Sequence, residues 1–195
     1  MRSTSQPRAR RERPRWRVGV LDSDERSRGE LSRLIEARGG LVVIDSPVRA
    51  DSVDLLRRME PDAVVLAADD GAGDPAGERP LPMDLSTAVV LLASPASART
   101  LRSARAAGVM GVLLRPLRAQ DLAPTLELAI ARFRELRRLR RALADQPLVE
   151  AAKARLMDRE GLSEPAAFGW LRRRAMERRI RIGEMARSVL GPDAR

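Results

Sequence analysis

Five short apolar runs, each followed by a polar or amphipathic segment, constrain the fold of this chain more than any other feature of its sequence. Small and β-branched residues dominate the runs, and this composition is typical of strands that are buried on both faces of a parallel sheet. The runs lie at Val18–Leu21, Leu41–Ile44, Ala63–Ala67, Ala88–Ala93 and Val112–Leu114. Residues 18 to 114 are therefore predicted to form a parallel sheet of five strands.

Segments with a helical spacing of apolar residues separate most of these runs. They lie at Arg26–Arg38, at Ala50–Met59, at Ser97–Ala107 and from about Gln120 onward. The interval Ala68–Ser86 is instead rich in Gly, Pro and Asp, so we expect a loop that replaces or shortens the third helix. The alternation predicts an α/β, flavodoxin-like fold, whose active crevice lies beyond the carboxyl ends of the strands.

Charge is divided unevenly along the 195 residues. Residues 1–17 carry seven Arg against Glu12, residues 18–131 carry 13 basic and 17 acidic groups, and residues 132–195 carry 17 basic and nine acidic groups. The net charges of these three parts are therefore +6, −4 and +8. A basic terminal module on an acidic body suits a polyanionic partner, because contacts with phosphates supply affinity. We expect residues 1–16 to form a disordered basic arm.

Several kinds of chemistry are excluded by what the sequence lacks. It contains no Cys and no His, which excludes disulfides, thiolate chemistry and the commonest metal ligand. No nucleophile–base pair or Gly-rich phosphate loop is visible, so we predict no enzyme activity, no cofactor and no metal site. No apolar run approaches the roughly 20 residues that a membrane helix needs, and no signal segment follows the basic start. We therefore expect a cytoplasmic protein with no membrane partner.

Three stretches of the chain resemble the receiver domain of bacterial response regulators. They are Val20–Glu25, Pro61–Leu66 and Gly108–Pro116. Receivers need a carboxylate nucleophile after the third strand, acidic groups for Mg²⁺, a hydroxyl after the fourth strand and a lysine after the fifth. The resemblance assigns these functions to Asp22 and Asp24, to Ala67, to Ala93 with Ser94 beside it, and to Arg115. Of the residues that the chemistry needs, only the two acidic groups survive. We predict that residues 17–118 form a pseudo-receiver that is not phosphorylated.

Asp69 and Asp70 leave a second interpretation open, because one of them could be a displaced phosphoryl acceptor in a phosphorylatable response regulator. Strands advance about 3.3 Å per residue, so a carboxylate two residues beyond the strand end would lie several ångströms from the usual point. Catalysis of this type tolerates such misplacement poorly. We favour a solvated turn rich in Asp and Gly.

Residues 119–146 carry a heptad pattern of apolar residues. The predicted seam is Leu122, Leu126, Ala129, Phe133, Leu136, Arg140 and Leu143, with Arg-rich flanks. This pattern predicts a coiled-coil helix that joins two copies of the chain and that ends at Pro147. The alternative is a helix that packs only on its own domain.

Three short helices are predicted from Leu148 onward. The expected inner faces are Val149, Ala152, Leu156 and Met157 in the first, Ala167, Phe168, Leu171 and Ala175 in the second, and Ile182, Met185, Ala186, Val189 and Leu190 in the third. Gly161 suits a left-handed cap after the first helix, Ser163 suits an N-cap of the second, and Gly191-Pro192 closes the third. Residues 191–195 form a tail.

The segment at 147–190 resembles the ANTAR family of transcription antiterminators. The resemblance rests on Ala152–Met157, Gly161–Glu164, Ala167–Met176, Met185-Ala186 and Val189-Leu190. It implies a small three-helix domain that binds paired hairpins in leader transcripts and so prevents a terminator from forming. Carried over by position, it implies an RNA surface at Ala152, Lys153, Arg172 and Ala175, with Arg173, Arg178 and Arg179 as additional candidates.

Within the family, residues 129–133 and the degenerate acceptor are most similar to antiterminators of nitrate and nitrite assimilation operons, and Leu190–Pro192 is similar to the amidase-operon type. Both resemblances imply that a ligand-sensing protein holds the antiterminator until a small molecule releases it. A receiver joined to a DNA-binding helix-turn-helix is a rival interpretation, because three helices and positive charge allow it.

Overall fold

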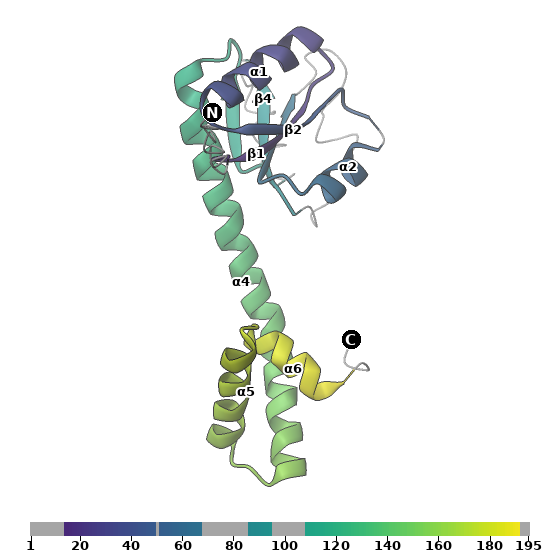
Figure 1. The fold of residues 1–195 in the computed structure, drawn as a ribbon, viewed down its shortest axis with the longest axis vertical. Coiled ribbons are helices and arrows are strands. Elements are labelled where there is room, and N and C mark those ends of the chain that lie inside the picture. The colour runs from purple at the N-terminus through teal and green to yellow at the C-terminus, as the bar shows by residue number, and fades with distance from the viewer. Residues whose placement is uncertain (1–13, 50, 68–85, 95–107, 192–195) are drawn as a thin grey trace, which may run out of the picture. The chain divides into compact units, whose positions relative to one another are not determined.

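The computed structural model describes residues 14–49, 51–67, 86–94 and 108–191. The chain forms two compact units, Met1–Phe133 and Arg134–Arg195, which we name the sheet unit and the helical unit. Figure 1 labels most of their helices and strands. Each unit is described by itself below.

A five-stranded, fully parallel sheet forms the centre of the sheet unit. Its strands are β1 (Arg17–Leu21), β2 (Leu41–Ser46), β3 (Ala63–Ala67), β4 (Ala88–Ala93) and β5 (Gly111–Leu114), and their order is β2-β1-β3-β4-β5. Backbone pairing is regular except for one irregularity between Val18 and Gly19, where β1 pairs with β2. This strand order confirms the predicted flavodoxin-like fold.

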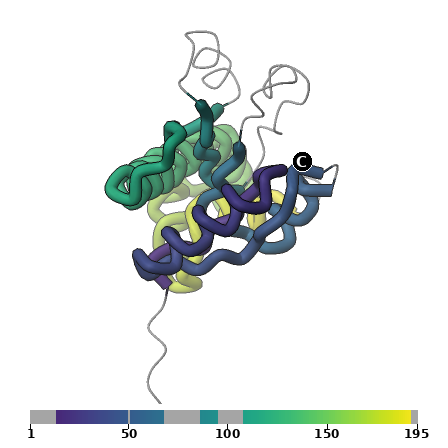
Figure 2. The backbone as a smooth tube through the Cα atoms, turned by 90° about the horizontal axis from the view of Figure 1, so that it is seen from above, coloured from purple at the N-terminus to yellow at the C-terminus, as the bar shows by residue number. Residues whose placement is uncertain are grey.

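Helices cover both faces of this sheet. On one face, α1 (Glu25–Ala37) and the first turns of α4 (Ala119–Glu160) lie against the central strands (Figure 2). They pack there through buried residues such as Leu31, Ile35 and Leu126. On the other face, Leu56 of α2 (Ser52–Met59) packs against Ile44 and Val64. The Asp24 side chain caps α1 by accepting a hydrogen bond from the amide of Arg26 at 2.9 Å.

All five predicted strands are present, with small differences at their ends. β2 is two residues longer than its apolar run, because Asp45 and Ser46 still pair with Val20 and Leu21. This edge strand meets only one neighbour, so polar residues can continue its ladder. The predicted helix at Ser97–Ala107 and the predicted loop at Ala68–Ser86 lie almost wholly outside the described residues, as does Ala50.

Helix α4 (Ala119–Glu160) runs without a break for 42 residues, so the prediction that a helix ends at Pro147 is wrong. An interior proline loses one backbone hydrogen bond and costs about 3 kcal/mol. Here the residues on both sides, Asp145 and Val149, are buried against the helical unit, and this packing holds the helix together. Despite the length of α4, no helix within the described ranges is apolar enough over a sufficient length to cross a membrane.

The predicted heptad seam is divided between two environments. Leu122, Leu126 and Ala129 have no exposed surface, because they pack against the sheet of their own unit. Leu136 and Leu143 are 40% and 69% exposed. The prediction of a continuous dimer contact is therefore wrong for the first half of the seam. There the helix packs on its own domain, as the alternative interpretation states.

The helical unit is built from the end of α4, α5 (Glu164–Arg178) and α6 (Ile182–Leu190). Its core contains Val149, Ala152, Leu156, Ala167, Leu171, Ala175, Met185 and Ala186. Met157 and Phe168, which we expected on inner faces, are 40% and 43% exposed. Each follows a core residue directly in sequence, and one residue along a helix turns a side chain by about 100° from its neighbour. The first of the three expected short helices is thus the end of α4.

Candidate nucleic-acid interface and remnant receiver site

The remnant receiver site lies at the carboxyl ends of the parallel strands. Asp22 follows β1, Ala67 ends β3 and Arg115 follows β5. Ala67 is 5% exposed, and its methyl group cannot attack phosphorus. Ser94 follows β4, and Asp69 and Asp70 lie outside the described residues.

Asp22 and Arg115 form a partly buried ion pair at this site. The Arg115 Nη2 atom donates to Asp22 Oδ2 at 2.7 Å, and Nη1 donates to the Ser27 hydroxyl at 2.7 Å. Burial alone would raise the pKa of Asp22, but hydrogen bonds from Ser27, from the Asp24 amide and from Arg115 together hold that pKa below its usual value. A cation from the protein itself therefore faces the acidic group that a receiver uses to hold Mg²⁺.

Asp24 has a local structural role, because its side chain caps α1 as described above. Among the residues that the structure describes, no group of three or more acidic, His or Cys side chains is placed to hold a metal ion. The two surviving acidic groups of the receiver pattern are thus engaged with an Arg side chain and with backbone amides.

Several exposed arginines lie on α5 of the helical unit and at its C-cap. The core stripe Ala167, Leu171 and Ala175 fixes which face of α5 is buried, and the residues between these positions turn away from that face. The exposed arginines are Arg172, Arg173, Arg178 and Arg179. Arg174, between them, pairs with Glu177 at 3.1 Å. This exposed positive charge can attract a polyanion.

Lys153, the only Lys of the chain, lies at the edge of the core and is 8% exposed. Its Nζ atom donates to Glu150 Oε1 at 2.9 Å and to Glu164 Oε1 at 2.7 Å. Hydrogen bonds to Glu150 and Glu164 raise its pKa above the usual value, so the ammonium stays charged. Its charge is thus already balanced by two carboxylates of the same unit.

Ala152 and Ala175 do not lie at a surface, which corrects the position expected for them. They are 0% and 4% exposed and belong to the core of the helical unit. The physical reason is close packing: in so small a unit, short side chains let α4 and α5 approach each other. We therefore do not assign RNA contacts to these two residues.

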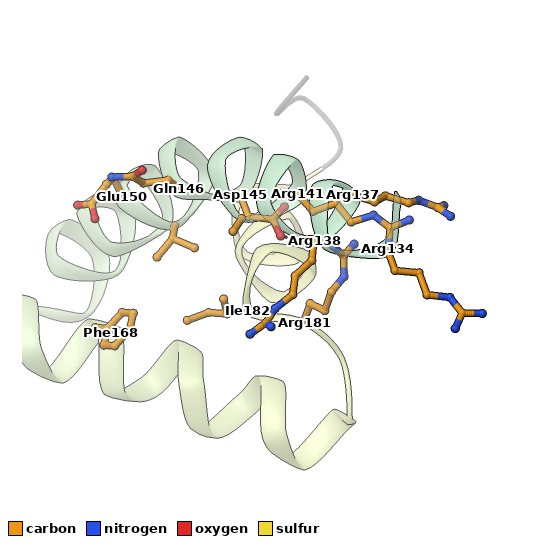
Figure 3. A pocket seen from close by; sticks show the side chains of 12 residues that line it. Arg134, Arg137, Arg138, Arg141, Asp145, Gln146, Glu150, Phe168, Arg181 and Ile182 are labelled. Atoms are coloured by element: carbon orange, nitrogen blue, oxygen red, sulfur yellow. Dashed lines mark ion pairs between the residues drawn. The ribbon is translucent and has the colours of Figure 1, made fainter. Parts of the chain in front are cut away.

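A groove of about 720 Å³ lies between α4, α5 and α6 of the helical unit (Figure 3). It is lined by Arg134, Arg137, Arg138, Arg141, Ala142, Asp145, Gln146, Val149, Glu150, Phe168, Arg181 and Ile182. Sequence reasoning missed this groove because its residues come from three helices. The Arg-rich flanks of the heptad pattern were the available signal.

Known proteins resemble the chain in both units. Residues 137–190 match the family model of the ANTAR domain. The chain is 30% identical over 188 residues to the transcriptional regulatory protein PdtaR of Mycobacterium tuberculosis, in strains CDC 1551 / Oshkosh and H37Rv, and the match covers 89% of this chain and 89% of the relative.

Two solved structures show the fold of the sheet unit. The receiver domain of a modulated diguanylate cyclase from Desulfovibrio desulfuricans G20 is 19% identical, with a TM-score of 0.52 over 61% of this chain and 96% of that one. The receiver domain of a response regulator NarL from Mycobacterium tuberculosis is 20% identical, with a TM-score of 0.51 over 61% of this chain and 98% of that one.

The two likenesses agree with the order of the domains along the chain, a receiver fold followed by an ANTAR domain. The ANTAR match begins at residue 137, ten residues before Pro147, and so includes part of the helix that we had expected to be a separate linker. This chain belongs to the family of ANTAR-domain transcriptional regulators that carry a receiver-like domain.

Proposed function

We propose that the protein is an RNA-binding transcription antiterminator, which binds paired hairpins in a leader transcript and so prevents a terminator from forming. The observation that carries the proposal is the group of exposed arginines on α5 and at its C-cap, Arg172, Arg173, Arg178 and Arg179, which lie outside the ANTAR core.

Arginine suits this role for two reasons. Its planar guanidinium binds phosphate through two hydrogen bonds, and it also stacks on exposed bases, which loops of folded RNA offer. Lys153 contributes less to the attraction of RNA, because Glu150 and Glu164 balance its charge.

Control of the protein, in this proposal, does not use phosphorylation. Ala67 replaces the nucleophile and Arg115 pairs with Asp22, so the sheet unit serves as a docking domain. A separate ligand-sensing protein would hold the antiterminator until its small molecule binds. The exposed residues Leu136, Leu139 and Leu143 of α4 would join two copies of the chain. The nitrate-operon and amidase-operon assignments remain predictions, which the genes beside this one test.

The first experiment measures binding at matched salt. Fluorescence anisotropy compares a labelled leader RNA that contains two hairpins with duplex DNA of the same sequence. We expect tighter binding to RNA and a loss of affinity in the double variant Arg172→Gln/Arg179→Gln. Arg58→Gln, an exposed position on α2 of the sheet unit, is the control for loss of charge elsewhere. Preference for the DNA duplex would instead favour a DNA-binding transcription factor.

The second experiment measures the activity itself. Single-round transcription of a template with the leader and its terminator should give more full-length transcript when the protein is added. Binding to the hairpins without any increase in readthrough would contradict antitermination and leave only an RNA-binding role.

A further inference from the structure

The groove of the helical unit combines an apolar floor with a cationic rim. Its apolar lining comes from Phe168 of α5, Ile182 of α6 and Val149 of α4, and Phe168 is 43% exposed. Five arginines lie on the rim, four from α4 and one, Arg181, from the start of α6, against two acidic groups. The excess of positive charge indicates an anionic occupant.

Contacts within the helical unit fix the shape of this groove. The buried carboxylate of Asp145 pairs with Arg187 at 3.1 Å and with Arg181 at 3.6 Å, which holds the start of α6 against α4. Arg181 also pairs with Glu184 at 2.8 Å. In Figure 3 the side chains of Arg181 and Arg138 lie together between α4 and α5. The side chain of Arg138 is 82% exposed and pairs with Glu135 at 3.8 Å.

An unpaired nucleotide has the chemistry that such a groove can recognise. Its base offers a flat, apolar face that can stack on Phe168, and its phosphates can meet the arginines of the rim. A base within a helical stem is already stacked on its neighbours and cannot enter. An acidic peptide would satisfy the arginines but would leave the aromatic floor without a planar partner.

We propose that this groove holds one unpaired loop nucleotide of the bound hairpin, with the base against Phe168 and the phosphates beside Arg138 and Arg141. The inference rests on the proposed RNA-binding function and gives it a specific feature. The exposed arginines of α5 bind RNA through phosphates and through any exposed base, whereas the groove adds a pocket that only an unpaired nucleotide can enter.

The test uses the full chain and two RNAs, a leader hairpin and a blunt duplex with the same stem but no loop. The wild type should bind the hairpin more tightly than the duplex. Phe168→Leu keeps an apolar side chain but removes the aromatic face, so hairpin affinity should fall roughly 5- to 150-fold while duplex affinity stays unchanged. Phe168→Trp should keep the preference. Met176→Leu, at an apolar position on α5 that is 68% exposed and outside the groove, should change neither affinity.

A second pair of variants tests the rim. Arg141→Gln removes a lining charge, whereas Arg140→Gln removes the adjacent exposed charge of the same helix, which does not line the groove. We expect the preference for the hairpin over the duplex to fall in Arg141→Gln by more than in Arg140→Gln.

The outcomes separate the two proposals. If the wild type binds neither RNA, the proposed function fails. If it prefers the hairpin and Phe168→Leu keeps the full preference, the groove inference is overturned while the function stands. A change of oligomeric state in Phe168→Leu, measured by light scattering with an unchanged preference, would assign the groove to a second copy of the chain and would also overturn the inference.

Discussion

Gly183 of α6 lies directly against the carboxylate of Asp145 of α4. A β-carbon at Gly183 would overlap the carboxyl carbon and both oxygens of Asp145. The Asp145 side chain is held in place by Arg187 and Arg181, so it cannot move aside without loss of two ion pairs. A glycine is required here because α4 and α6 approach so closely, and the backbone of α6 itself is ordinary.

Gly183→Ala should therefore destabilise the helical unit by about 1–3 kcal/mol, as overpacking of a filled core does. Gly169→Ala on α5 is the matched control, because its β-carbon would meet only the flexible tip of Arg173 at 3.6 Å. That control should be neutral or should stabilise the unit by up to about 1 kcal/mol, since alanine favours helix. Urea unfolding in a Trp16→Phe background, followed by Trp170 fluorescence, measures both. Equal effects of the two variants would contradict the close approach.

Asp22 should contribute stability that depends on pH in a defined direction. Its pKa in the folded protein lies below the ordinary value of 3.8, so its contribution is complete above that value and is lost as pH falls through the folded pKa. Asp22→Asn should cost about 1–3 kcal/mol at pH 7, because Arg115 keeps its position but loses its carboxylate. The difference in the free energy of unfolding between wild type and Asp22→Asn should shrink toward acidic pH.

The control for this experiment is Asp24→Asn, which removes the same charge two residues away while keeping a good N-cap side chain. Urea unfolding in a Trp170→Phe background, followed by the fluorescence of Trp16, which is buried in the sheet unit, gives the free energy of unfolding at each pH. A difference between wild type and Asp22→Asn that stayed constant down to pH 3 would show that the ion pair does not set this pKa.

The strands were predictable from sequence because short runs of apolar, β-branched residues are typical of strands that are buried on both faces of a parallel sheet. Ala63–Ala67 and Ala88–Ala93 match the observed strands to the residue. The break at Pro147 was predicted wrongly because local sequence reports the lost hydrogen bond but not the tertiary packing of Asp145 and Val149 that offsets it.

The candidate site was less predictable than the fold. Exposure of Arg172 and Arg173 follows from the helical spacing of core residues, which sequence shows well. Whether Ala152 faces a ligand or another helix depends on how closely the helices approach, and spacing alone cannot decide that. The groove around Phe168 depends on three helices that meet only after folding.

Lys153 and Arg172 should respond differently to the loss of their charge. Arg172 is exposed, so Arg172→Gln should weaken RNA binding and lower the slope of log affinity against log salt by about 1. Lys153 is paired with Glu150 and Glu164, so Lys153→Gln should mainly lower the melting temperature of the helical unit. The raised pKa of Lys153 means that its stabilising charge is present at neutral pH and is lost only above its ordinary value of 10.5.

Salt titrations of RNA affinity and thermal melts of the same samples test this pair. Arg159→Gln, an exposed position near the end of α4, is the control for a lost charge in the same unit. A loss of RNA affinity in Lys153→Gln that exceeds the loss in Arg172→Gln, at an unchanged melting temperature, would return Lys153 to the direct RNA contact that the family resemblance implies.

Incubation with a small acyl phosphate and Mg²⁺ should leave the protein unmodified. Ala67 supplies no nucleophile, and the Arg115 guanidinium, 2.7 Å from Asp22, already balances one of the acidic groups that would hold the metal. Ala67→Asp restores the nucleophile alone. This variant should also remain unmodified, because phosphoryl transfer needs the metal and correctly placed cations as well as the attacking oxygen. Intact mass, with an active receiver domain treated in parallel, measures both proteins. A stable phosphoryl adduct on the wild type would mean that another carboxylate, such as Asp69 or Asp70, accepts the group, and control by phosphorylation would then replace control by a sequestering partner.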